Sequence, residues 1–118
     1  MQNFIVNAIE KTYRLEAKAY LPNRVEELAK TYGLSYKKVK INNAKTRWGS
    51  CSSENNINLS LQLMRLPDHL IDYVLLHELA HTKVKNHSIH FWDFLDSITD
   101  CKAKNLDKEL KSFYLQVF

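Results

Sequence analysis

The chain has 118 residues, of which 45% are hydrophobic and 25% are charged, with a formal net charge of +4. This length and composition indicate one folded domain over residues 1–118 and argue against a disordered chain. The longest apolar runs are far shorter than the roughly 20 residues of a membrane helix, and the first residues lack a secretory-signal pattern. Cys51 and Cys101 stand alone, which excludes a cysteine-based zinc finger and a disulfide-rich scaffold. We therefore expect a soluble, cytoplasmic domain that does not bind membranes.

Positive charge is concentrated in the first part of the chain. Residues 1–47 carry ten Lys or Arg against four Glu, whereas residues 48–118 carry seven against nine acidic residues. A basic region can bind nucleic acid or another polyanion through counterion release. However, the lysines are spread out and no basic run exceeds two residues, which is typical of a solvated helix surface. Nucleic acid therefore stays a weakly supported alternative partner.

The first quarter of the chain is predicted to be helical. Apolar and aromatic residues recur near helical spacing over residues 3–31. Pro22 is expected to break this helix or to start a second one, with Asn23 as its cap. Gly33 is expected to end the second segment, because glycine readily adopts the left-handed conformation of a helix end.

Three short strands are expected after these N-terminal helices. Residues 36–41 and 57–61 alternate apolar with polar residues, which is typical of half-exposed strands. Turn-forming residues occupy positions 42–43 and 52–56, and residues 45–50 between them would return towards the first strand. Together these segments predict a small antiparallel sheet.

Three further helices are predicted after the sheet. Pro67 suits the first turn of a helix, and the residues between it and His81 give that helix an apolar body. Apolar stripes predict two more helices at residues 91–98 and 106–114, after an interruption at residues 86–88. A helix, then a small sheet, then further helices along the chain indicate an α+β fold.

The sequence His-Glu-Leu-Ala-His at residues 77–81 carries the chemistry. Residues i and i+4 lie on one helical face, so His77 and His81 can bind one zinc ion together. Glu78 can then accept a proton from a metal-bound water as that water attacks the substrate. Two ordinary helix-surface histidines are the alternative. The surrounding helix is apolar, however, and unpaired polar groups would be costly there.

A catalytic zinc normally has three protein ligands and one open position. His87 lies ten residues after His77, which is the spacing of the metzincin signature, although Val84 stands where that signature has glycine. Asn86 is expected to supply the left-handed turn instead, because asparagine tolerates positive φ. His87 is therefore the predicted third ligand. The weaker alternatives are His90, Asp93 and Asp96.

Four motifs carry a resemblance to a known family: RWGSCS (47–52), Pro67, DYVLLHELAH (72–81) and NHSIHFW (86–92). At these residues the chain resembles the YgjP-like metal-dependent hydrolases, which are zincin-type proteins related in layout to the SprT-like metalloproteases. The resemblance implies a zincin-like fold and one zinc ion per chain, bound by His77, His81 and His87, with Glu78 as the catalytic base. Family members are about twice this length. The chain is thus either a short relative or the C-terminal catalytic part of a longer architecture.

Arg47 and Trp48 are candidate substrate-binding residues. They lie near the end of a predicted strand, and in zincin-like folds a strand edge beside the metal can pair with an extended peptide. On this hypothesis Arg47 holds an anionic group of the substrate. The alternative is that Trp48 belongs to the core and Arg47 pairs with a carboxylate. Cys51 is expected to be an unreactive thiol, because no sequence feature supplies a base for it.

The leading functional prediction is a zinc-dependent hydrolase of the metallopeptidase type, acting on a peptide or a related bond. Three imidazoles favour zinc among the available divalent metals. The first alternative is a nucleoside triphosphate pyrophosphatase, because some relatives are described as acting on UTP; no glycine-rich phosphate-binding loop is visible. The second alternative is a non-catalytic, zinc-stabilised module that binds nucleic acid. Glu78 argues against it, since a structural metal site gains little from an adjacent base.

Overall fold

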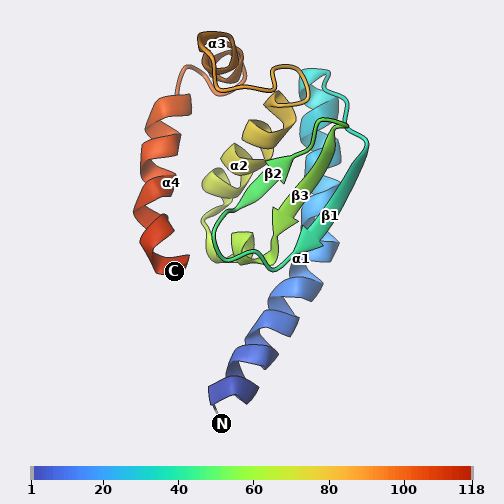
Figure 1. Cartoon of the computed structure of the whole chain (residues 1–118), viewed down its shortest axis with the longest axis vertical. Helices are drawn as coiled ribbons and strands as arrows, with labels where there is room; N and C mark the ends of the chain where they lie inside the picture. Colours follow the sequence, from blue (N-terminus) through green and yellow to red (C-terminus); the bar gives the residue numbers. More distant parts are fainter. Residues whose placement is uncertain (1, 118) are drawn as a thin grey trace.

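Over the residues that the structure describes, four α-helices and a three-stranded sheet make up the fold (Figure 1), which confirms the predicted α+β class. The computed structural model describes residues 2–117, and it describes side chains for residues 4–113. The elements in chain order are α1 (Gln2–Tyr32), β1 (Lys38–Asn42), β2 (Gly49–Cys51), β3 (Asn56–Ser60), the 3-10 helix η1 (Leu61–Arg65), α2 (Asp68–Ala80), α3 (Ile89–Ser97) and α4 (Ala103–Val117). Over the described residues, none of the helices is both long and apolar enough to cross a membrane.

Helix α1 runs without interruption through Pro22, so the predicted break and the second N-terminal helix are wrong. Proline removes one hydrogen-bond donor from the helix, but it does not prevent the flanking residues from packing. Leu21 and Val25 are both fully buried on the core side of α1. Asn23 does not cap a new helix; its Nδ2 donates to the carbonyl oxygen of Ala19 within α1 (3.2 Å). Tertiary packing therefore overrides the local preference of proline.

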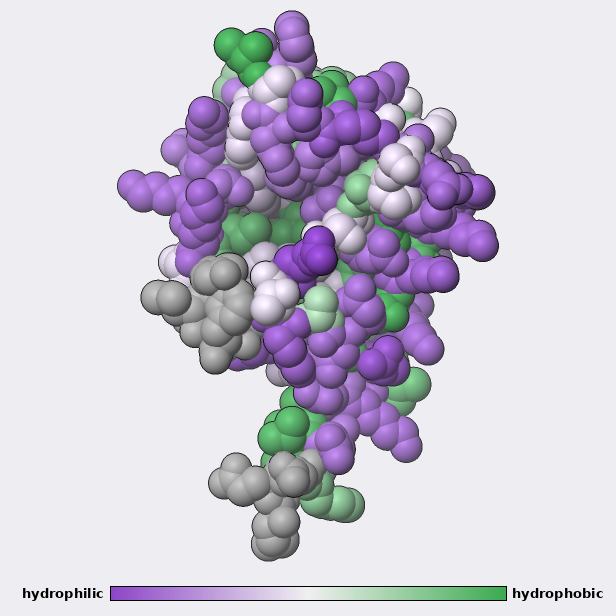
Figure 2. Space-filling view, viewed as in Figure 1, coloured by the Kyte–Doolittle hydropathy of each residue, from purple (hydrophilic) through white to green (hydrophobic). Residues whose placement is uncertain are grey.

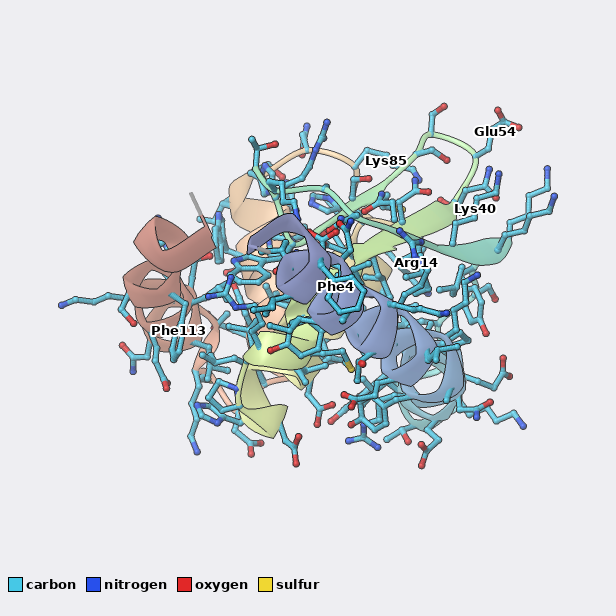
Figure 3. The ribbon with its side chains drawn as sticks, turned by 90° about the horizontal axis from the view of Figure 1, so that it is seen from below. Phe4, Arg14, Lys40, Glu54, Lys85 and Phe113 are labelled. Atoms are coloured by element: carbon cyan, nitrogen blue, oxygen red, sulfur yellow. The ribbon has the colours of Figure 1, made fainter. Side chains whose placement is uncertain are left out.

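The two ends of α1 have different surroundings. At the C-terminal end, Gly33 has a φ of +66°, and the N–H of Leu34 donates to the carbonyl oxygen of Ala29 (2.8 Å). This is a Schellman-type end, and it confirms the prediction that Gly33 ends the helix. At the other end, α1 projects beyond the rest of the molecule (Figure 1), and Phe4 is exposed there (Figure 3).

The sheet has the strand order β1-β3-β2 and is mixed, not antiparallel as predicted. Strand β2 pairs antiparallel with β3 through a tight turn, whereas β1 pairs parallel with β3. Strand β3 takes the central position because Ile57 and Leu59 are fully buried, more deeply than the apolar residues of β1. The chain therefore crosses from one edge of the sheet to the other between β1 and β2, which a local reading of turns does not reveal.

Helix α2 lies at the centre of the molecule, behind the sheet and between α1 and α4 (Figure 1). One face of the sheet packs against α1 and α2, and α4 packs against α2 on another side. Arg24 of α1 forms a bidentate ion pair with Asp72 of α2, with both N–O distances at 2.8 Å. Because α2 is packed on several sides, side chains near its C-terminal end are held in fixed positions.

Candidate metal centre

The C-terminal end of α2 presents the histidines of the HExxH motif. Pro67 precedes the first turn of α2, and Asp68 in that turn is favourable next to the positive end of the helix dipole. Most residues of α2 are buried, so the helix is stabilised by its packing. His77 lies in the last turn, and His81 follows directly as the C-terminal cap with helical dihedral angles. Both imidazoles therefore project from one side of the helix.

His87 from the following loop joins these two histidines. The ring centroids of His77 and His81 are 5.0 Å apart, those of His77 and His87 are 5.4 Å apart, and those of His81 and His87 are 4.7 Å apart. One nitrogen from each ring lies within 4.8 Å of the other two. A tetrahedral zinc ion with Zn–N bonds of about 2.0–2.1 Å holds its nitrogen ligands about 3.3–3.4 Å apart. The three side chains thus fit one zinc ion after small adjustments.

The environment of His81 sets both its tautomer and its charge. Its Nδ1 donates to the carbonyl oxygen of Val84 (3.0 Å), which leaves Nε2 as the atom that can bind a metal. That Nε2 faces the Nε2 of His87 at 3.1 Å. Burial lowers the pKa of His81 and so favours the neutral imidazole, which is the form that binds metals.

The loop between α2 and α3 does not use Asn86 for a left-handed turn, so that prediction is wrong. Within residues 2–117, positive φ values occur at Gly33, Asn55, Asp100 and Cys101. The chain instead leaves α2 through a helical turn, in which the amides of Lys83 and Val84 both donate to the carbonyl oxygen of Ala80. Continuation of the helical hydrogen bonding thus turns the loop back and brings His87 to the cluster.

Aromatic residues of α3 form the apolar side of the cluster. Phe91 is fully buried and stacks on the ring of His81, with centroids 4.3 Å apart and an angle of 19° between the planes. The Trp92 ring lies 6.4 Å from that of His77 and 6.5 Å from that of His87. His90 is exposed on the same helix and is not part of the cluster; neither are Asp93 and Asp96. Phe91 thus shields one side of the histidine cluster from solvent.

Lys85 ties the loop that carries His87 to the sheet. Its Nζ donates to the carbonyl oxygen of Ser52 (3.0 Å) and to Oδ1 of Asn55, both in the turn between β2 and β3. Figure 3 places Lys85 on the same side of the molecule as the strands. Sequence reasoning did not identify Lys85, because nothing in the local pattern indicates a contact with a turn 30 residues away.

Glu78 lies directly under strand β2. Its side chain is 8% exposed, and its Oε2 is 3.4 Å from Nδ1 of His77. A Cβ atom added to Gly49 of β2 would come within 3.2 Å of Cγ of Glu78 and within 3.2 Å of the carbonyl oxygen of Asn58. Gly49 thus permits a close approach between the strand and the carboxylate. Gly49 is a second residue that sequence reasoning missed, although it stands inside the RWGSCS motif.

A cleft of about 220 Å³ opens beside His77 and Glu78, between the start of β2 and helix α4. Arg47 is exposed at this cleft and forms no ion pair with any described residue, in contrast to the alternative that paired it with a carboxylate. Trp48 is half-buried and packs against the core while it also lines the cleft. The lining residues are Thr46, Arg47, Trp48, Gly49, Tyr73, Val74, His77, Glu78, Asp107 and Leu110.

Tyr73 of α2 lines this cleft and contacts α4 on its other side. Its ring lies edge-on to His77, with centroids 5.9 Å apart, and its hydroxyl donates to Oδ1 of Asp107 on α4 (3.1 Å). Burial, followed by the nearby Asp107 carboxylate, raises the pKa of Tyr73 well above its ordinary value. Tyr73 therefore stays protonated and positions α4 relative to α2.

Cys51 and Ser60 lie near the site, and their surroundings indicate structural roles. Cys51 is half-buried, and burial raises the pKa of its thiol, which agrees with an unreactive thiol. Ser60 caps η1: its Oγ accepts from the N–H of Gln62 (3.1 Å) and donates to the carbonyl oxygen of Ala44 (2.8 Å). Neither side chain is part of the histidine cluster.

Comparison with known proteins identifies a family, and two metallopeptidase zymogens are among the similar solved structures. The family model described as YgjP-like, metallopeptidase domain, matches residues 1–113. The metallopeptidase zymogen abylysin of Pyrococcus abyssi has a TM-score of 0.67 and 24% identity, over 77% of this chain and 91% of that chain. The metallopeptidase zymogen jannalysin of Methanocaldococcus jannaschii has a TM-score of 0.63 and 25% identity, over 80% of this chain and 93% of that chain. No curated protein sequence matches the chain. These similarities confirm the predicted zincin-like fold.

Proposed function

Because the chain belongs to the YgjP-like metallopeptidase family, we propose that it is a zinc-dependent peptidase with its active site at the C-terminal end of α2. One observation carries this proposal: three imidazoles converge beside the nearly buried carboxylate of Glu78, at the head of a cleft. A structural zinc site needs neither an adjacent base nor an opening to solvent. The arrangement therefore suits catalysis.

His77, His81 and His87 would hold the metal. Zinc is the proposed ion because three neutral nitrogen ligands match its preferences, and a fourth position would remain open for a substrate or a water molecule. When bound, zinc would supply a Lewis acid that polarises a substrate carbonyl and lowers the pKa of a water molecule. The hydrogen bond from Nδ1 of His81 to the carbonyl of Val84 orients this ligand in advance.

Glu78 is the proposed general base. Its carboxylate accepts the proton of the attacking water and then delivers a proton to the departing amine. Its low exposure shields that proton from bulk solvent, and Gly49 holds the strand close enough to limit its movement. Strand β2 pairs with β3 along one edge and with no described strand along the other. We propose that an extended peptide lies along this free edge of β2, with Arg47 and Trp48 beside it.

A Glu78→Gln variant tests this proposal. The expected result is that zinc binds with one ion per chain, as in the wild type, while cleavage of a mixed peptide library falls by about a thousandfold or more. Fragments are identified by mass spectrometry, and the same protein is incubated with UTP to detect release of pyrophosphate.

Three results would contradict the proposal. Equal peptide cleavage by the wild type and Glu78→Gln would remove the role of Glu78. Release of pyrophosphate from UTP without any peptide cleavage would favour the nucleotide hydrolase. A zinc-loaded wild type without either activity, but with strongly salt-dependent DNA binding, would favour a binding module.

A further inference from the structure

The face of the sheet that points away from the helices is polar. Along β3, Ile57 and Leu59 point into the core, so the alternate residue Asn58 points outward. Asn58 pairs in register with Ser50 of β2 on one side and with Lys40 of β1 on the other. The three side chains thus form one row across the outer face. Figure 2, which looks onto this side of the molecule, shows predominantly hydrophilic residues over the strands.

A hollow of about 190 Å³, called the polar hollow below, lies at the β2 end of this row. Its groups are mostly hydrogen-bond donors: the Arg47 guanidinium, the Ser50 hydroxyl and the amides of Asn42 and Asn58. Oδ1 of Asn42 already accepts from the N–H of Ala44 (3.1 Å), so its Nδ2 is the end that can donate. The described residues that line the polar hollow are Asn42, Ala44, Arg47, Gly49, Ser50 and Asn58, and none is acidic.

Among the described residues, these donor groups have no hydrogen-bond acceptor. The side chains of Arg47, Ser50 and Asn58 form no ion pair or hydrogen bond with another side chain or carbonyl over residues 4–113. Lys40, next to Asn58 in the row, is likewise exposed and unpaired over these residues (Figure 3). The polar hollow is thus lined by one cation, Arg47, and three neutral donor groups, with Lys40 next to it in the row and no carboxylate in its lining. This set of groups favours an anion at this place.

The polar hollow adjoins the cleft at the metal centre. Arg47 and Gly49 line both cavities, and Glu78 lies directly beneath Gly49. A peptide that follows the free edge of β2 therefore passes Arg47 within a residue or two of Glu78. A side chain of such a peptide can reach over β2 into the polar hollow.

We propose that the polar hollow binds a carboxylate of the peptide substrate, so that the enzyme prefers an acidic side chain close to the scissile bond. The guanidinium of Arg47 takes the two carboxylate oxygens as a bidentate pair, and the amide of Asn58 and the hydroxyl of Ser50 donate further hydrogen bonds. This inference rests on the proposed peptidase function, and the first experiment below separates the two.

The first experiment compares cleavage of paired peptides. The peptides differ in a single residue, Glu or Gln, placed in turn at each position on either side of the cleaved bond. At one position the wild type is expected to have a kcat/KM for the Glu peptide about fivefold above that for the Gln peptide, with a smaller ratio at high salt. In Arg47→Gln the ratio should fall to about one, whereas Lys38→Gln, one row away on the same outer face, should keep the wild-type ratio.

The outcomes separate the two claims. Cleavage of both peptides by the wild type at equal rates, at every position tested, overturns the carboxylate site and leaves the peptidase proposal standing. A wild-type preference for Glu that persists in Arg47→Gln also overturns it. A preference that is lost equally in Arg47→Gln and Lys38→Gln would mean that overall charge, and not the polar hollow, selects the substrate.

A binding measurement makes the test independent of turnover. Zinc-loaded Glu78→Gln, labelled with ¹⁵N, is titrated with N-acetyl-glutamate amide, N-acetyl-glutamine amide and inorganic phosphate. The glutamate compound is expected to shift the side-chain amide signals of Asn42 and Asn58, and the glutamine compound is not. Larger shifts with phosphate than with the glutamate compound would assign the polar hollow to a phosphate group and overturn the peptide carboxylate.

Discussion

Replacing Gly49 with alanine should disturb Glu78 without touching a histidine. The new Cβ would lie 3.2 Å from three atoms: Cγ of Glu78, Cδ2 of Leu59 and the carbonyl oxygen of Asn58. All three distances are shorter than ordinary carbon contacts, so at least one neighbour must move by a few tenths of an ångström. The carbonyl of Asn58 belongs to the paired strand and Leu59 is fully buried. Glu78 is therefore the group that is free to shift.

The magnitude follows from these contacts. Overpacking of this kind costs about 1–3 kcal/mol, and the stiffer unfolded chain of an alanine variant returns about 0.4–1 kcal/mol. We expect Gly49→Ala to lose about 1 kcal/mol of unfolding free energy, or about 3–5 °C in Tm. Displacement of a catalytic group by less than 1 Å should lower kcat by about tenfold or more. Zinc affinity should stay at the wild-type value, since none of the three contacts is a ligand.

Gly33→Ala is the matched control for this prediction. Gly33 has a φ of +66° and no atom within 4 Å of an added Cβ, so alanine there introduces backbone strain without a clash. Its unfolding free energy should fall by about 1–2 kcal/mol, while kcat stays unchanged. Thermal unfolding, zinc titration and peptide cleavage are measured on both variants. A kcat of Gly49→Ala equal to that of Gly33→Ala would refute the argument that the glycine sets the position of Glu78.

Three further variants test contacts that hold the site or stabilise the fold. Lys85→Met should weaken zinc binding by about tenfold in a chelator competition, because it frees the loop that carries the third histidine. The control is Lys83→Met, which replaces an exposed lysine of the same loop and should leave zinc binding unchanged. Asp72→Asn breaks the bidentate pair with Arg24 and should lower the free energy of unfolding by about 1–2 kcal/mol in urea titrations. An unchanged free energy of unfolding would show that the pair is only a surface contact. Burial raises the pKa of Tyr36 to about 12, so the folded state retains a proton that the unfolded state loses above about pH 10. The free energy of unfolding should therefore fall as the pH rises through 10–12, and Tyr36→Phe should make this fall less steep. An equally steep fall in Tyr36→Phe would contradict the raised pKa of Tyr36.

The histidine pair was predictable because its geometry is local. An i, i+4 spacing fixes the relative positions of His77 and His81 once a helix forms, and the apolar residues around them predict that helix. His87 was the expected third ligand, and the structure brings its ring next to theirs. The loop that carries His87 differs from the expected one, because it turns by extending the helical hydrogen bonds of α2 and not through a left-handed Asn86.

Features that depend on contacts between distant segments were not predictable. Pro22 has a local preference to break a helix, but the packing of Leu21 and Val25 decides the outcome. The parallel pairing of β1 with β3 places two segments side by side that do not follow each other in the chain. The roles of Gly49 and Lys85 likewise arise from contacts with Glu78 and with the turn at Ser52. No local pattern encodes such contacts, whereas helix spacing and turn composition are local.

The most direct test of the account is the zinc content of three proteins after reconstitution and removal of free metal. Wild type and His90→Ala are expected to hold close to one zinc ion per chain, because His90 is exposed outside the cluster. His87→Ala is expected to hold much less than one, since it lacks the third nitrogen ligand. Equal zinc content in all three proteins would contradict the assignment of His87. A wild type that cannot be loaded with zinc at any concentration tested would contradict the metal centre itself.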